Sequence, residues 1–120
     1  MTIAAAQAQK FYQQVTADQH VFTFLADDSY LVFKVGDAEV VPFWSSRSRL
    51  DRVQTLHPKY RNYMVDEISL DQFLTKTLSQ FREEQIRVGV NWSGRRLTGY
   101  DLTADDLERN LKYWLAKASG

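Results

Sequence analysis

Two segments of the sequence contain residue types that could bind a ligand or a partner. The first, residues 42–49, reads Pro-Phe-Trp-Ser-Ser-Arg-Ser-Arg. If a strand passes directly into a helix there, the free N–H groups of the first helical turn lie close to serine hydroxyls and guanidinium groups. All of these groups donate hydrogen bonds to anions, so the segment is suited to a phosphate or a carboxylate. Its candidate residues are Trp44, Ser45, Ser46, Arg47 and Arg49.

The second segment, residues 89–101, reads Gly-Val-Asn-Trp-Ser-Gly-Arg-Arg-Leu-Thr-Gly-Tyr-Asp. It predicts a β-hairpin with a tight turn at 93–94, because glycine adopts the backbone conformations that such turns require. Tryptophan and arginine dominate the binding energy of many interfaces. A structural role is an alternative for both segments, since serines cap helices, tryptophans fill cores and arginines are common on surfaces. The candidate residues here are Asn91, Trp92, Arg95 and Arg96.

Charge distinguishes the first segment from the rest of the chain. Overall, 15 Lys and Arg residues balance 15 Asp and Glu residues, so a general affinity for nucleic acid is not expected. Between residues 45 and 62, Asp51 is the one acidic residue. The basic residues there are Arg47, Arg49, Arg52, Lys59 and Arg61. This local excess of positive charge favours an anionic ligand or partner.

The sequence contains no recognisable catalytic or metal-binding pattern. Its two histidines, His20 and His57, are far apart and belong to no zinc-binding motif. Cysteine is absent, which excludes thiol catalysis and fits a cytoplasmic location. The glycines stand singly and no serine lies in a nucleophile-elbow pattern. We therefore expect no catalytic residue, no cofactor and no metal.

The elements that must position these residues are predicted from hydrophobic periodicity. Helical spacing predicts helices over residues 3–16, 45–56, 69–81 and 103–115. Alternation predicts strands over residues 21–25, 30–35, 39–43, 63–68, 86–92 and 97–100. The expected helix caps are Ser45 or Ser46, then Ser69 with Gln72, then Thr103.

The element order αβββαβαββα predicts an α+β fold. Short turns join the first three strands, so an antiparallel meander is expected, because parallel neighbours need a long crossover. We predict a single mostly antiparallel sheet of about six strands with helices packed mainly on one face. The length suits a single domain over residues 1–120. No signal peptide or membrane-spanning run is recognised, so no membrane partner is expected.

Several short stretches of the sequence also resemble a known family. The similarity is to the bacterial family called domain of unknown function 2750, and it lies in Phe11-Tyr12 and in residues 40–49, 67–73 and 89–101. The strings PFWSS, GVNWSG and LTGYDL carry most of the resemblance, which covers nearly the whole chain. It implies a small bacterial cytoplasmic protein. The family has no established activity, so it implies no catalytic residues.

Three functions follow as alternatives. The first is a non-catalytic protein-interaction module, of which an immunity or antitoxin-like role is one version. It requires residues 44–49 and 91–96 to lie side by side as one outward-facing site that contacts an unknown protein. The second is binding of a small anion or nucleotide at the helix start near Ser45 and Ser46. The third is an enzyme of unknown reaction, which requires one of the two histidines to meet Ser45, Asn91, Tyr100 or Asp101 in a pocket.

Overall fold

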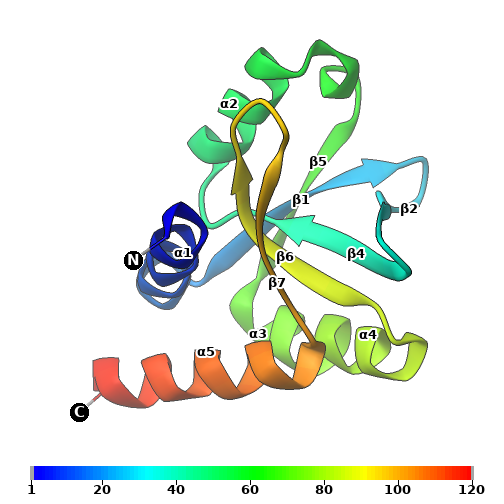
Figure 1. Cartoon of the computed structure of the whole chain (residues 1–120). Coiled ribbons are helices and arrows are strands. Elements are labelled where there is room, and N and C mark those ends of the chain that lie inside the picture. Colours follow the sequence, from blue (N-terminus) through cyan, green and yellow to red (C-terminus); the bar gives the residue numbers. More distant parts are fainter. Residues whose placement is uncertain (1, 120) are drawn as a thin grey trace.

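The structure is a computed structural model and describes residues 2–119. Its elements follow the chain in the order α1 (Ile3–Asp18), β1 (His20–Ala26), β2 (Ser29–Tyr30), β3 (Phe33–Val35), β4 (Ala38–Phe43), α2 (Arg47–Leu56), a 3-10 turn (Pro58–Tyr60), β5 (Met64–Ser69), α3 (Leu70–Gln72), a π-helical segment (Phe73–Thr77), α4 (Leu78–Glu84), β6 (Arg87–Ser93), β7 (Thr98–Leu102) and α5 (Ala104–Ser119) (Figure 1). The predicted α+β class is confirmed.

The predicted helix starts are confirmed by their capping hydrogen bonds. The hydroxyl of Ser46 accepts from the N–H of Arg49 at 3.3 Å, and that of Ser69 accepts from Gln72 at 3.2 Å. Thr103 accepts from the N–H of Asp106 at 3.1 Å. Each bond satisfies a backbone donor that has no partner inside its helix, which is why serine and threonine mark these starts.

The strands form two sheets, so the prediction of a single sheet was wrong. The first sheet has the order β2-β1-β5 and is antiparallel throughout. The second has the order β3-β4-β6-β7, and within it β4 and β6 are parallel. The connection between these parallel strands runs through α2, β5 and the helical segment 70–84, which provides the long crossover that parallel pairing needs.

The two sheets arise because the predicted strand 30–35 divides at Leu31 and Val32. Residues 29–30 pair with β1, whereas residues 33–35 pair with β4. The chain therefore leaves one sheet and enters the other within a few residues. The expected three-stranded meander was also wrong, since β1 and β4 lie in different sheets.

One short junction joins the sheets. Phe22 and Trp44 exchange backbone hydrogen bonds, with distances of 2.9 and 2.8 Å from the donor nitrogen to the acceptor oxygen. Beside them, the buried hydroxyl of Thr23 donates to the carbonyl oxygen of Pro42 at 2.7 Å. We call these four residues the sheet junction.

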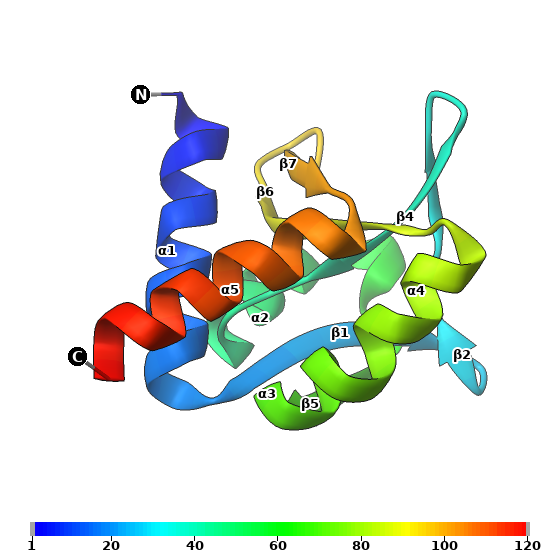
Figure 2. The ribbon, with the colours of Figure 1, turned by 90° about the horizontal axis from the view of Figure 1, so that it is seen from below.

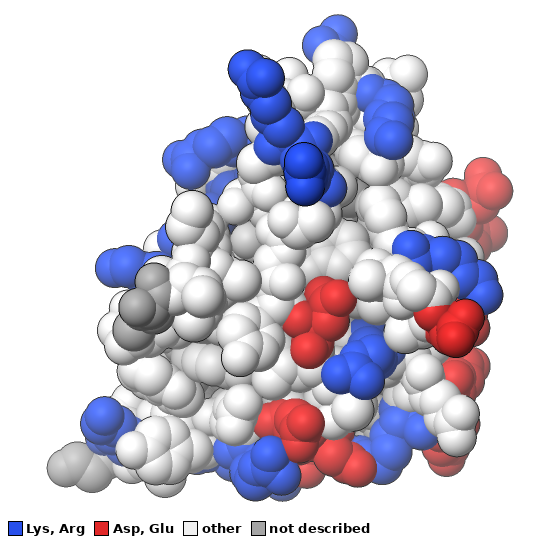
Figure 3. Space-filling model, in the orientation of Figure 1, with Lys and Arg blue, Asp and Glu red and all other residues white. Residues whose placement is uncertain are grey.

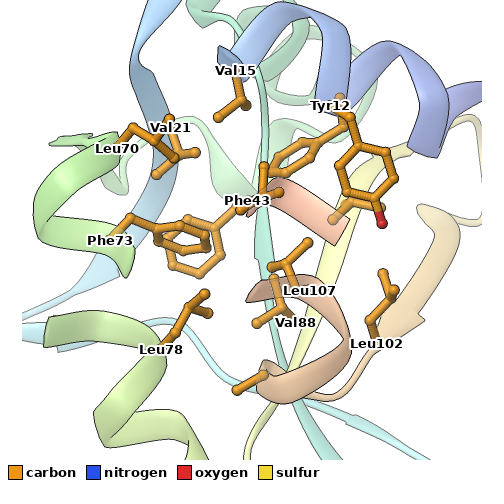
Figure 4. Close-up of a cluster of buried hydrophobic side chains, with 14 of the residues drawn as sticks. Tyr12, Val15, Val21, Phe43, Leu70, Phe73, Leu78, Val88, Leu102 and Leu107 are labelled. Atoms are coloured by element: carbon orange, nitrogen blue, oxygen red, sulfur yellow. The ribbon is translucent and has the colours of Figure 1, made fainter. Parts of the chain in front are cut away.

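Helices cover both faces of the strands, so the prediction of helices mainly on one face was wrong, and each face has its own core. The first core lies beneath α1, α5 and the helical segment 70–84, and Phe43 of β4 packs in it against Phe73 with ring centroids 4.9 Å apart (Figure 4). The second contains side chains of α2 and the 3-10 turn, and α2 lies behind the strands in Figure 2, where α5 is in front of them. The second core consists of Phe24, Val40, Trp44, Leu50, Val53, Tyr60, Trp92 and Leu97.

No helix within residues 2–119 combines the length and the apolar character needed to cross a membrane.

The sheet junction generates a stability prediction. Thr23→Val keeps the side-chain shape but removes the donor to Pro42, so we expect it to lower the free energy of unfolding by about 1–3 kcal/mol. Thr55→Val is the control, because the Thr55 hydroxyl is exposed and bonds only to Asp51 in its own helix. Its effect should stay within about 0.5 kcal/mol. Urea unfolding measures both variants, and equal losses would show that the junction bond adds no stability.

Candidate functional site

The two candidate segments meet in space, as the sequence hypothesis required. The indole N–H of Trp44 donates to the carbonyl oxygen of Trp92 at 2.8 Å. The backbone N–H of Ser45 donates to the side-chain oxygen of Asn91 at 2.9 Å. The end of β4 and the end of β6 are thus joined directly, and the hairpin tip lies beside α2 (Figure 1).

Four of the nine candidate residues do not face outward. Trp44, Ser45 and Asn91 are 1% exposed and Trp92 is 3% exposed. Both indoles belong to the second core, so they cannot form part of a binding surface. The side chains that remain accessible are those of Ser46, Arg47, Arg49, Arg95 and Arg96.

A β-bulge explains why Trp92 packs in the second core. Simple alternation would place it on the same face as Val88 and Val90, which belong to the first core. The pairing of β6 with β7 shifts register between Val90 and Ser93, and Asn91 adopts a positive φ of 50°. The bulge turns the next side chain to the opposite face. Asparagine tolerates this left-handed conformation better than most residues.

The hairpin turn is longer than predicted. Residues 94–97 form a four-residue turn, closed by a bond from the N–H of Leu97 to the carbonyl oxygen of Gly94 at 3.1 Å. The expected two-residue turn at 93–94 was therefore wrong. Leu97 is buried in the second core, which holds the turn against the molecule and leaves Arg95 and Arg96 exposed.

The glycines of the second motif make room for the Trp92 indole. A Cβ atom on Gly89 would overlap the indole ring, and one on Gly99 would lie 2.8 Å from its Cδ1 atom. The indole N–H donates to the Asp101 carboxylate at 2.9 Å. Gly89, Trp92, Gly99 and Asp101 therefore form one structural unit.

A partly buried polar network connects the two segments to α1. Asn91 donates through Nδ2 to the Ser45 hydroxyl at 3.0 Å and to the carbonyl oxygen of Gln7 at 3.3 Å. Ser45 donates in turn to the side-chain oxygen of Gln14. Neither glutamine was predicted from the sequence as part of a site. Their seven-residue spacing, two helical turns, is the signal that places them on one side of α1.

Arg49 completes this network from α2. Its Nε donates to Gln14 at 3.0 Å and its Nη1 donates to Gln7 at 3.1 Å. Both acceptors are neutral amide oxygens, and none of the ion pairs within residues 2–119 includes Arg49. Burial, together with the positive charge of Arg52, lowers the pKa of the Arg49 guanidinium.

Basic side chains gather around α2 and the hairpin tip. His57 Nε2 lies 2.8 Å from the carbonyl oxygen of Gly94 and so ties the end of α2 to the tip. In Figure 3 the Lys and Arg side chains in this region have no Asp or Glu among them in the view shown. Asp51 is the one acidic residue in residues 45–62 and 93–97, and it is paired with Arg47 at 3.0 Å. We call this region the basic pole; its residues are Arg47, Arg49, Arg52, Lys59, Arg61, Arg95 and Arg96.

The start of α2 offers an anion fewer donors than the sequence suggested. The N–H of Ser45 is bonded to Asn91, and the N–H of Arg49 is bonded to the Ser46 hydroxyl. These two backbone donors are already engaged by acceptors inside the molecule. The geometry therefore does not favour anion or nucleotide binding at Ser45 and Ser46 themselves.

Neither histidine contacts the side chains that an enzyme site would require. His20 Nδ1 lies 3.2 Å from a carboxylate oxygen of Glu67, and His57 contacts the Gly94 carbonyl. Ser45 bonds to Asn91 and Gln14, and Asp101 bonds to Trp92. In the part of the chain that the structure describes, no cluster of three or more His, Asp or Glu side chains could hold a metal ion.

The fold and the candidate site define an α+β protein in which the most recognisable sequence motifs build the interior and the basic residues lie outside. A family model described as "Protein of unknown function (DUF2750)" matches residues 8–111. The chain therefore belongs to this family, and the resemblance seen in the sequence is confirmed.

Comparison with other proteins adds no functional information. No curated protein matches the chain. Among solved structures, the chain is similar to Tic22 from Plasmodium falciparum, with 17% sequence identity and a TM-score of 0.40. The match covers 71% of this chain and 48% of that one, so the chain spans about half the length of Tic22.

The contact between Gly89 and Trp92 can be tested with a double-mutant cycle. Gly89→Ala places a methyl group against the indole, so we expect it to lower the free energy of unfolding by about 1–3 kcal/mol. In a Trp92→Leu background the same substitution should cost less than half as much, because the clashing ring is gone. Denaturant unfolding of the four proteins gives the coupling. Additive losses within about 0.5 kcal/mol would contradict the contact.

Asp101 generates a prediction about pH. Desolvation raises the pKa of its carboxyl above the ordinary value of 3.8, although the Trp92 N–H and Arg87 act in the opposite direction. The folded state therefore holds this proton more tightly than the unfolded state, and the stability it contributes is lost as pH rises through the folded pKa. Asp101→Asn keeps an acceptor for Trp92 without the charge.

We therefore expect the stability of Asp101→Asn, measured relative to the wild type, to increase as the pH rises from about 3.5 to 7. Urea unfolding of both proteins across this range measures the difference and cancels the contribution of the other carboxyl groups. A difference that does not change with pH, or that changes in the opposite direction, would show that burial does not control this carboxyl.

Proposed function

We propose that the chain is a non-catalytic protein-interaction module that docks an acidic surface of another protein on its basic pole. The observation that carries this proposal is the segregation of charge. The pole contains seven basic residues against Asp51 alone. The remainder of the chain is left with eight Lys and Arg residues and fourteen Asp and Glu residues. A chain of zero net charge is thus strongly dipolar.

Such a dipole favours a partner with a compact acidic patch. Complementary potentials steer two proteins into a preferred orientation and raise the rate of association. The acidic remainder of the chain would repel an extended polyanion such as nucleic acid, which follows a longer path over the surface. An acidic protein surface is therefore favoured over nucleic acid as the partner.

The turn that carries Arg95 and Arg96 is fixed by contacts with the rest of the molecule. The turn is anchored by buried Leu97 and by the contact between His57 and Gly94. A loop that is fixed before binding loses less conformational entropy when a partner docks. The buried residues Trp44, Ser45, Asn91 and Trp92 support this proposal from inside by joining the hairpin to the start of α2.

The setting of the interaction is also an inference. The resemblance to the family implies a bacterial cytoplasmic protein, and the absence of cysteine from the sequence fits a reducing compartment. An immunity or antitoxin-like function is one form of the proposed interaction, because such proteins act by binding a protein target.

Charge reversal on the pole should abolish capture of the partner. We expect Arg95→Glu and Arg96→Glu each to reduce the amount of acidic protein recovered from a native lysate by about tenfold or more, since the substitution turns attraction into repulsion. Lys76→Glu is the matched control, because it makes the same charge change at an exposed residue outside the pole. It should leave recovery within about twofold of the wild type. Quantitative mass spectrometry of the bound proteins measures the effect.

Two further treatments separate the alternatives. Raising the salt concentration to about 1 M should release the partner, because exposed charges are then screened beyond about 3 Å. Nuclease treatment of the lysate should change nothing. If Arg96→Glu and Lys76→Glu recover the same proteins equally, the basic pole is not the docking surface. Loss of the signal on nuclease treatment would assign the pole to nucleic acid instead.

A further inference from the structure

A small, partly open cavity lies between α1, α2 and the base of the hairpin tip. Its volume is about 60 Å³. One water molecule needs about 10–15 Å³ on this scale, so the cavity has room for a few waters or for one small polar group. Its polar wall is formed by Gln7, Arg49, Arg52, Asn91 and Ser93, and its apolar wall by Trp44, Val53, Leu56 and Trp92.

The acceptor groups of the polar wall are already engaged. The side-chain oxygen of Gln7 accepts from Arg49, and that of Asn91 accepts from the N–H of Ser45. The Ser93 hydroxyl oxygen accepts from Nε2 of Gln7 at 2.8 Å. Gln14, just behind the wall, accepts from Arg49 as well.

The donor groups are in excess. A guanidinium group has five N–H donors, and Arg49 uses its Nε and one position of Nη1 for the two glutamines. Its remaining donors, the Ser93 hydroxyl proton and the whole guanidinium of Arg52 have no acceptor among the side-chain bonds of residues 2–119. Arg52 is exposed and none of these donors is buried without a partner, so they are open to water, and an occupant with only acceptor atoms complements them.

The charge around the cavity also favours an occupant that accepts hydrogen bonds and is negative. Arg49 and Arg52 both line the cavity, and neither takes part in an ion pair within the part of the chain that is described. The indoles, Val53 and Leu56 keep part of the wall apolar, and an apolar wall strengthens the attraction between unlike charges. A guanidinium matches the planar, two-oxygen geometry of a carboxylate.

We propose that this cavity binds a single carboxylate group, held by Arg49 and Arg52. At about 60 Å³ the cavity is far smaller than the roughly 300 Å³ at which pockets for whole small molecules begin. It therefore suits the carboxylate of a small acid or of an acidic side chain and not a nucleotide. The second source would be the anchor residue of the partner, and that part of the inference rests on the proposed function.

Titration with acetate tests the cavity without any partner. We expect sodium acetate, added to ¹⁵N-labelled protein at constant ionic strength against sodium chloride, to shift a limited set of NMR signals in a saturable way. These signals are the Arg49 Nε–H, the Trp44 indole N–H and the backbone N–H groups of Ser93 and Gly94. Shifts that are linear with acetate concentration, or that chloride reproduces, would overturn the proposal.

Two matched substitutions distinguish a site from a general field. Arg52→Gln removes a charge from the cavity wall, whereas Arg61→Gln removes the same charge from the pole outside the cavity. We expect Arg52→Gln to weaken acetate binding about tenfold, the loss that corresponds to one charge-assisted hydrogen bond. Arg61→Gln should change it by no more than about twofold. Equal effects would overturn the proposal. Arg52 makes no internal hydrogen bond among the described side chains, so neither variant should disturb the fold.

A nine-residue peptide of three Gly-Glu-Ser repeats separates the two sources of the carboxylate. Shifts at the cavity and at the backbone N–H groups of Arg95 and Arg96 would support an acidic side chain as the anchor. Shifts with acetate but not with the peptide would retain the cavity and assign it to a free acid. Peptide shifts at the tip alone, with no response to acetate, would overturn the cavity while leaving the docking function of the pole intact.

Discussion

The buried hydrogen bond between the Trp44 indole and the Trp92 carbonyl is the contact on which the arrangement of this molecule depends. An indole N–H left without a partner in a core costs about 1–3 kcal/mol, so burying Trp44 requires an acceptor at a fixed place. The acceptor lies on β6, 48 residues further along the chain. The backbone of Trp44 also pairs with Phe22 across the sheet junction. One residue therefore holds β1, β4 and β6 in register with one another.

Neighbouring residues extend this contact into a polar layer. Ser45 and Asn91 follow and precede the two tryptophans, and their bonds to Gln7 and Gln14 bring α1 into the same network. The glutamine oxygens then accept from Arg49, whose guanidinium is drawn in toward α1. Because those partners are neutral, the positive charge of Arg49 is positioned but not neutralised. The interior thus determines where unpaired positive charge stands at the base of the hairpin.

Local features of the fold could be predicted from the sequence and non-local ones could not. The helix starts at Ser46, Ser69 and Thr103 depend on a side chain and a backbone donor three residues apart, so the pattern identifies them. The division of residues 30–35 between two sheets depends on pairing partners distant in sequence. The bulge at Asn91 also depends on strand pairing, here between β6 and β7, so the alternation of residues along β6 alone does not predict it. The proximity of the two candidate segments was predicted, but the burial of both indoles is decided by α2 and the 3-10 turn packing over them.

The distribution of charge is another feature that the composition alone does not predict. A formal net charge of +0 argued only against a general affinity for nucleic acid, because a sum has no direction. The fold adds the direction, since it packs α2 and the 3-10 turn beside the hairpin tip and leaves the acidic residues elsewhere on the chain. Two stretches that are some thirty residues apart in sequence then contribute to one field. The tip would carry two isolated arginines if its turn were free, but with Leu97 buried and Gly94 held by His57 it adds its charges to those of α2. The electrostatic character of this protein is therefore a property of its tertiary structure, produced by the same apolar packing that removes the tryptophans from the surface.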